Sequence, residues 1–239
     1  ELGFGCGSIG GLLVRGAYPD MRRVVARAIE RGVTYFDTAS SYGNGQSEAN
    51  LGAVLRELGA GGDVVVGTKV RFTAADLENI QDAVAASVEA SLRRLGRDSV
   101  DLIQFHNRIG AARQVESVQV TPDDLQTIVE SFRGLQRQGK VRYWGFTALG
   151  ETPALQAAID DLDFHSIQSC YNMLNPTAGR DHAARFSPSR FRADHRPRQC
   201  AAEGSDRDPR AGGRRTQRQR QPPPGRFVVG QPHRVRSRI

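Results

Sequence analysis

Short apolar segments alternate with longer amphipathic ones from the start of the chain to about residue 171. The short segments are rich in β-branched and aromatic residues and predict strands, whereas the longer ones repeat apolar residues at helical spacing. The predicted strands cover residues 2–6, 34–38, 64–70, 100–106, 141–147 and 166–171. The predicted helices cover residues 20–31, 47–58, 82–95 and 121–139, and a fifth begins at residue 152.

Capping residues mark the ends of several predicted helices. Thr121-Pro122 has the form of an N-cap followed by a first helical proline, and Gly96 follows the apolar stripe that ends at Leu95. A strand followed by a helix, repeated about six times, predicts an α/β fold of the (β/α)8 TIM-barrel type rather than an open sheet. Such a barrel needs eight strands, and the pattern stops near residue 176. We therefore expect an incomplete barrel of about six βα units, in a domain that spans residues 1–176.

The composition changes abruptly after residue 176. The 239-residue chain has a formal net charge of +7, but residues 1–176 contain 17 Lys and Arg against 21 Asp and Glu. Residues 177–239 contain 16 Arg, no Lys, 5 acidic residues, seven Pro and no Leu. A segment with so few apolar side chains cannot bury enough surface to offset the entropy cost of ordering it. We therefore predict a basic, Arg- and Pro-rich, disordered tail over residues 177–239.

The cysteines and the apolar run lengths bear on the cellular location. Cys6, Cys170 and Cys200 show no metal-ligand spacing, so we expect reduced structural thiols and no metal site. No apolar run approaches the roughly 20 residues that span a bilayer, and no signal peptide opens the chain. These features predict a soluble, cytoplasmic protein. The chain begins at Glu1 within a predicted strand, so we expect that its natural N-terminus is missing.

Titratable residues follow three of the predicted strands. Asp37, Lys69 and His106 each stand at or near the end of a strand, and Tyr42 follows shortly after Asp37. In a barrel of parallel strands, the carboxyl ends of the strands converge on one face, which carries the catalytic residues. Taken singly, each residue also fits a structural role as a cap, a half-buried aromatic residue, a solvated strand end or a core histidine. Their shared position favours one reaction centre.

These four side chains suit the reduction of a carbonyl group. The reaction needs a hydride on carbon and a proton on the developing alkoxide, so an acid must stand beside a nicotinamide-type donor. Tyr42 is the candidate acid: a free tyrosine titrates only near pH ~10, and a neighbouring ammonium such as Lys69 would stabilise the phenolate. Asp37 would hold Lys69 in its charged form, and His106 could polarise the carbonyl oxygen.

Five segments resemble motifs of the aldo-keto reductase family, in the family's order. They are FDTASSYG (36–43), GTK (67–69), DLIQFHN (101–107), QGKVRYWGFT (138–147) and IQSCYN (167–172). The catalytic tetrad of that family is Asp, Tyr, Lys and His, which match Asp37, Tyr42, Lys69 and His106. By this resemblance Tyr42 would be the proton donor, Lys69 and Asp37 its tuning pair, and His106 the group that orients the carbonyl.

The resemblance covers about residues 1–176 and implies an activity and a cofactor. The activity would be NAD(P)H-dependent reduction of a small-molecule aldehyde or ketone, or the reverse oxidation, with NADP or NAD as the cofactor. Gln168 and Thr147 fall where the family binds the nicotinamide carboxamide, although ordinary polar roles in a barrel also suit them. The family often has Ser-Asn at the positions of Thr147 and Ala148, so one cofactor contact differs here.

Other functions stay open from the sequence. Residues 5–10 fit the G-x-G-x-x-G dinucleotide pattern after a strand, but Gly11, Gly16 and Pro19 interrupt the helix that must follow, so we interpret the pattern as a tight turn at the barrel mouth. A non-catalytic member of the same fold, which senses nucleotides or binds a partner, is an alternative. The loop at residues 107–120 is expected to line the substrate pocket.

The tail allows two further hypotheses. Sixteen arginines could attract nucleic-acid phosphates, but the tail lacks the interleaved aromatic residues of a stacking platform, so nucleic-acid binding is not the expected function. We favour a reading-frame shift in GC-rich coding DNA, because arginine without lysine, with abundant Pro and Gly, is typical of such DNA out of frame. An unclosed barrel would expose strand edges, which predicts weak or absent turnover and a tendency to aggregate.

Overall fold

Six parallel strands form one sheet in the computed structural model, which describes residues 2–7, 11–170 and 172–173. Each strand pairs with its neighbours in sequence, in the order β1 to β6. The strands are β1 (Gly3–Gly5), β2 (Tyr35–Asp37), β3 (Val65–Val70), β4 (Val100–Phe105), β5 (Val141–Thr147) and β6 (Ser166–Gln168). The predicted strands are thus confirmed in number, order and direction, although several are shorter than expected.

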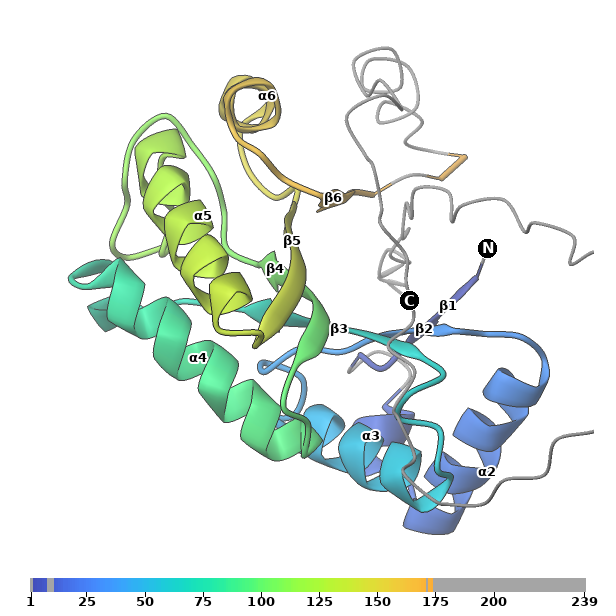
Figure 1. Cartoon of the computed structure of the whole chain (residues 1–239). Coiled ribbons are helices and arrows are strands. Elements are labelled where there is room, and N and C mark those ends of the chain that lie inside the picture. The colour runs from blue at the N-terminus through green and yellow to red at the C-terminus, as the bar shows by residue number, and fades with distance from the viewer. Residues whose placement is uncertain (1, 8–10, 171, 174–239) are drawn as a thin grey trace, which may run out of the picture.

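Helices connect successive strands and lie on the outer side of the curved sheet (Figure 1). They are α1 (Leu12–Arg15), α2 (Tyr18–Glu30), α3 (Gln46–Glu57), the short 3-10 helix η1 (Ala75–Leu77), α4 (Ile80–Leu95), α5 (Pro122–Arg137) and α6 (Thr152–Asp161). Capping agrees with the sequence at α5, where Thr121 and Asp124 form a capping box ahead of Pro122. Helices α1 and η1 were not expected from the sequence pattern.

The sheet curls far enough for its sixth strand to reach its second. Gln168, at the end of β6, donates a hydrogen bond from Nε2 to Oδ2 of Asp37, at the end of β2, over 3.2 Å. An open twisted sheet would separate the ends of these two strands by several strand widths. The structure therefore confirms an incomplete barrel of the (β/α)8 type rather than an open sheet.

The two faces of the curled sheet differ in character. Residues on the outer face, such as Phe36, Val66, Ile103 and Phe146, are apolar and fully buried, and they belong to one core cluster with the apolar sides of the helices. Because side chains alternate along a strand, the adjacent residues point into the barrel. Towards the carboxyl ends of the strands these inward residues are polar or glycine: Asp37, Gly67, Lys69, Gln104, Gly145, Thr147 and Gln168. Nearer the amino ends, Tyr35, Val65, Leu102 and Tyr143 share the same face. The fold thus separates a packed core from an interior that is polar at the carboxyl ends of the strands.

Two further predictions concern the C-terminal tail and membrane spans. The predicted tail at residues 177–239 lies outside the described residues, as does Cys200. In the part of the chain that the structure describes, no helix is both long enough and apolar enough to cross a membrane.

Candidate active site

Asp37, Lys69 and Tyr42 are in direct contact at the carboxyl ends of β2 and β3. The Lys69 side chain is completely buried, and its ammonium donates to Asp37 Oδ1 at 2.9 Å and to the carbonyl oxygen of Thr38 at 2.8 Å. Its third hydrogen bond goes to the phenolic oxygen of Tyr42 at 3.1 Å. A buried ammonium needs a counter-charge and a full set of acceptors. Asp37 and Thr38 supply two of these, and the phenol is the third.

His106 belongs to a second set of hydrogen bonds, which begins just after β4. Its Nδ1 lies 2.7 Å from the hydroxyl oxygen of Thr147, at the end of β5. That hydroxyl donates to Oε1 of Gln168 at 3.2 Å, and Gln168 in turn donates to Asp37. The structure therefore joins all six residues singled out from the sequence in one continuous network, from Tyr42 at one end to His106 at the other.

Burial and positive charge keep the imidazole of His106 neutral. Desolvation is the largest cause and the Lys69 and Arg71 charges add to it, lowering the pKa of His106 from 6.5 to about 4. At neutral pH the ring therefore carries one proton, on either Nδ1 or Nε2. A neutral imidazole of this kind can form hydrogen bonds without adding a charge to the site.

A second tyrosine lies close to Asp37 but differs from Tyr42. The hydroxyl of Tyr35 donates to Asp37 Oδ1 at 3.4 Å. Burial, together with the negative charge of Asp37, raises the pKa of Tyr35 well above its usual value. Tyr35 is almost fully buried, whereas Tyr42 is only partly buried. Of the two phenols, Tyr42 is therefore the one that is more accessible to a ligand.

A loop of unusual backbone conformation places Tyr42. The three residues that follow it, Gly43, Asn44 and Gly45, have φ angles of 60°, 51° and 87°, in the left-handed region that favours glycine. This tight loop leads directly into α3, where the Ser47 N–H donates to the carbonyl oxygen of Tyr42 at 3.2 Å. The sequence Gly-Asn-Gly supplies the residues that such a loop requires.

The first turn of α3 contains two supporting residues that the sequence analysis missed. Ser47 is buried; its hydroxyl donates to the carbonyl oxygen of Cys6 at 2.9 Å and lies 2.9 Å from the hydroxyl of Thr38. Glu48 is also buried and accepts from the side chains of Thr68 and Arg94, at 2.5 Å and 2.6 Å. The sequence signal for this support was Glu48, a carboxylate on the helix face that otherwise carries Leu51, Val54 and Leu55.

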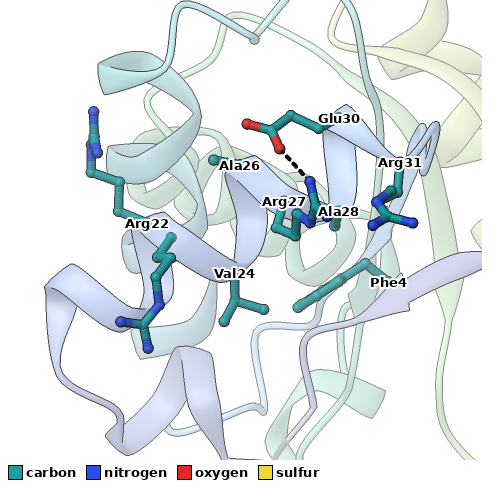
Figure 2. A pocket seen from close by; sticks show the side chains of 9 residues that line it. Phe4, Arg22, Val24, Ala26, Arg27, Ala28, Glu30 and Arg31 are labelled. Carbon is teal, nitrogen blue, oxygen red and sulfur yellow. Dashed lines mark hydrogen bonds and ion pairs between the residues drawn. The ribbon is translucent and has the colours of Figure 1, made fainter.

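The structure also contains a hollow that is separate from this network. It has a volume of about 840 Å³ and is lined by Phe4 of β1 and by residues of α2. Figure 2 shows Phe4 beneath the helix near Val24 and Ala28, and the ion pair of Arg27 with Glu30 at its rim. This hollow lies on the outer side of the sheet, whereas the six candidate residues lie on the inner side. Within the described ranges, no group of three His, Cys, Asp or Glu residues could hold a metal ion.

Comparison with known proteins identifies a family. A family model described as "Aldo/keto reductase family" matches residues 1–185. Aldo-keto reductase YhdN from Bacillus subtilis (strain 168) is 30% identical over 186 residues, which are 72% of this chain and 50% of that protein. The chain thus spans about half the length of the curated relatives that it matches.

Solved structures agree with this match. An aldo/keto reductase from Klebsiella pneumoniae, in complex with NADP and acetate, has 27% identity and a TM-score of 0.58, covering 76% of this chain and 58% of that one. The holo form of aldo-keto reductase AKR11C1 from Bacillus halodurans has 28% identity and a TM-score of 0.54, covering 72% of this chain and 53% of that one.

Proposed function

Because this chain belongs to the aldo/keto reductase family, we propose that it is an NADP(H)-dependent oxidoreductase, which reduces an aldehyde or ketone to an alcohol or catalyses the reverse oxidation. The observation that carries the proposal is the contact of 3.1 Å between Lys69 Nζ and the phenolic oxygen of Tyr42. Similarity to an NADP complex supports the choice of cofactor.

Tyr42 is the proton donor in this proposal. As a carbonyl is reduced, negative charge develops on its oxygen, and a positioned acid must supply a proton. The buried ammonium of Lys69 stabilises the phenolate that remains after the transfer. Asp37 balances the charge of Lys69, so that the ammonium can stay buried beside the phenol. His106, which is joined to Asp37 through Thr147 and Gln168, would orient the carbonyl oxygen by a hydrogen bond.

The polar groups at the ends of β5 and β6 fit a nicotinamide carboxamide. A carboxamide has one acceptor oxygen and a donor NH2 group, and the hydroxyl of Thr147 and the amide of Gln168 offer both donors and acceptors. Both residues are buried and at present bind each other, so the carboxamide would have to exchange with these hydrogen bonds. NADPH, when bound, supplies the hydride. The residues of this chain hold it, exclude water and move the proton.

The loop after β4 is the proposed wall of the substrate site. Asn107 holds it by accepting from the Phe72 N–H at 2.8 Å and donating to the carbonyl oxygen of Val118 at 3.3 Å. Ile109 is bonded by its N–H to the carbonyl oxygen of Leu149 at 2.8 Å. Hydrogen bonds thus join the loops that follow β3, β4 and β5 close to His106. The substrate proposed for this site is a small carbonyl compound or alcohol.

Steady-state kinetics of the full chain tests the proposal. NADPH oxidation would be followed with a panel of aldehydes and ketones for the wild-type chain, Tyr42→Phe and Tyr18→Phe. Tyr18 is a matched control, since its exposed side chain binds Glu57 and takes no part in the hydrogen bonds described above for the six candidate residues. We expect turnover that falls at least about 100-fold in Tyr42→Phe, as for loss of a general acid, and does not change in Tyr18→Phe. No turnover by the wild-type chain, or equal rates for Tyr42→Phe, would refute the proposal.

A further inference from the structure

The hydrogen bonds that join His106 to Asp37 leave only one consistent arrangement of protons. The carboxylate of Asp37 can only accept, because it is ionised and paired with the Lys69 ammonium. The Gln168 side chain must therefore turn its NH2 group to Asp37 Oδ2, and its Oε1 then faces Thr147. The reverse orientation of the amide would place two acceptors, Oε1 and Oδ2, against each other.

The hydroxyl of Thr147 has a single proton, and in this arrangement that proton points to Gln168 Oε1. If the proton pointed at His106 instead, lone pairs of Thr147 and Gln168 would face each other over 3.2 Å. With the proton on the side of Gln168, the hydroxyl oxygen must accept from His106 Nδ1, which lies 2.7 Å away. Tautomers are assigned from such networks, because each shared hydrogen has one donor.

We propose that Gln168 and Thr147 hold His106 in the tautomer with its proton on Nδ1, so that Nε2 is an acceptor in the cofactor-free protein. Burial supports a neutral ring at neutral pH, since the pKa of His106 is lowered to about 4. Thr147 is then a positioning residue, which acts through His106, as well as a proposed cofactor contact.

This tautomer has a consequence for catalysis, which rests on the proposed function. A carbonyl oxygen needs a donor, and His106 can donate from Nε2 only if the proton is there. A carboxamide NH2 that docks on Gln168 Oε1 would replace the Thr147 hydroxyl, which could then donate to His106 Nδ1. One proton leaves Nδ1 and one reaches Nε2 by exchange with water, so the ring stays neutral. Occupation of the carboxamide site would thus create the donor that the carbonyl requires.

Nitrogen-15 NMR of the full chain with labelled histidine tests the first step at pH 7, without any cofactor. The shifts and couplings of the ring nitrogens show which one carries the proton, and His106→Gln assigns the His106 signals. We expect the His106 proton on Nδ1, with Nε2 unprotonated. A His106 proton on Nε2 in the cofactor-free protein would overturn the proposal.

Variants of Thr147 and Gln168 test whether these residues set the tautomer of His106 or only support the fold. In Gln168→Leu the Thr147 hydroxyl loses its acceptor and is free to donate to His106, so the proton should move to Nε2. Thr147→Val removes the acceptor for Nδ1–H and should also raise the share of the Nε2–H form, whereas Thr147→Ser should keep the wild-type tautomer. If His106 has the same tautomer in wild type, Gln168→Leu and Thr147→Val, the claim that Thr147 and Gln168 set this tautomer is wrong.

Addition of NADP⁺ tests the second step and separates the inference from the proposed function. Saturating NADP⁺ should move the His106 proton from Nδ1 to Nε2 in the wild-type chain. If NADP⁺ binds, as shown by changed signals of the described residues, but the His106 proton stays on Nδ1, the proposed change of tautomer on cofactor binding is wrong. If NADP⁺ does not bind while the cofactor-free tautomers are as expected, the proposed function fails and the Nδ1–H assignment stands.

Discussion

The hydroxyl of Thr68 donates a hydrogen bond of 2.5 Å to the buried carboxylate of Glu48, and this contact ties β3 to the first turn of α3. Thr68 precedes Lys69 on the strand, and Tyr42 lies just ahead of α3. The contact between Thr68 and Glu48 therefore joins the two backbone segments that supply the ammonium and the phenol. This hydrogen bond, on the outer side of the sheet, therefore helps to hold both Tyr42 and Lys69 in place.

Thr68→Val removes this hydrogen bond while it preserves the shape of the side chain. Glu48 Oε1 then lacks its donor, and we expect a loss of about 1–3 kcal/mol in the free energy of unfolding. We also expect kcat to fall with little change in KM, because the phenol is less firmly placed against Lys69. Urea unfolding and steady-state kinetics measure both effects, and Thr68→Ser should restore them. A Thr68→Ser variant as impaired as Thr68→Val would contradict this explanation.

Asp37→Asn leaves the buried Lys69 ammonium without its counter-charge. Breaking a buried ion pair in this way costs about 3–5 kcal/mol, so we expect a loss of this size in urea unfolding. The double variant Asp37→Asn/Lys69→Met removes the uncompensated charge and should recover part of the loss. Glu89→Gln is the control, because Glu89 pairs with Lys140 at the surface and its removal should cost less than about 1 kcal/mol. Equal losses in Asp37→Asn and Glu89→Gln would contradict the prediction.

Two helical glycines should respond in opposite ways to alanine. A Cβ at Gly52 on α3 would collide with the backbone of Leu95 at the end of α4, so Gly52→Ala should destabilise the protein by about 1–3 kcal/mol. Gly134 lies in α5 with open space around it, and Gly134→Ala should stabilise by about 0.5–1 kcal/mol through helix propensity. Thermal unfolding of both variants measures these effects. A stabilised Gly52→Ala variant would show that α3 and α4 are not in close contact.

His106 should make the protein less stable in mild acid. The folded state holds the pKa of His106 at about 4, below its ordinary 6.5, so between these pH values the unfolded chain binds more protons. The contribution of His106 is therefore present above pH 6.5 and is lost as the pH falls towards 4. The free energies of unfolding of the wild type and His106→Gln, measured from pH 7.5 to 4, should converge in this window by up to about 3 kcal/mol. Parallel curves would show that the histidine titrates normally.

The sequence predicted the strands because each alternates or concentrates apolar residues in a short run. It also predicted that Asp37, Lys69 and His106 share one face, because the carboxyl ends of parallel strands must meet in a barrel. That inference needs only the order of strands and helices, and the structure places these three side chains in one network. The short helix α1 was not predicted, since four residues next to glycines carry no helical periodicity.

Contacts between elements were beyond the reach of the sequence. Nothing in the local pattern shows that Glu48 meets Arg94, 46 residues away, because that pairing depends on how α3 and α4 pack. The hydrogen bond between Gln168 and Asp37 likewise depends on how tightly the sheet curls. The sequence suggested cofactor roles for Gln168 and Thr147, but their present partners became visible only in three dimensions.

Isotope transfer tests the central claim, that this chain moves a hydride from NADPH to a carbonyl with Tyr42 as the acid. The full chain would be incubated with a reactive aldehyde and NADPH deuterated at C4 of the nicotinamide, on either face, and the alcohol analysed by mass spectrometry. We predict one deuterium on the former carbonyl carbon from one of the two NADPH epimers, and far less deuterated alcohol with Tyr42→Phe. An alcohol without deuterium from both epimers, or the same amount of deuterated product from Tyr42→Phe, would contradict the account.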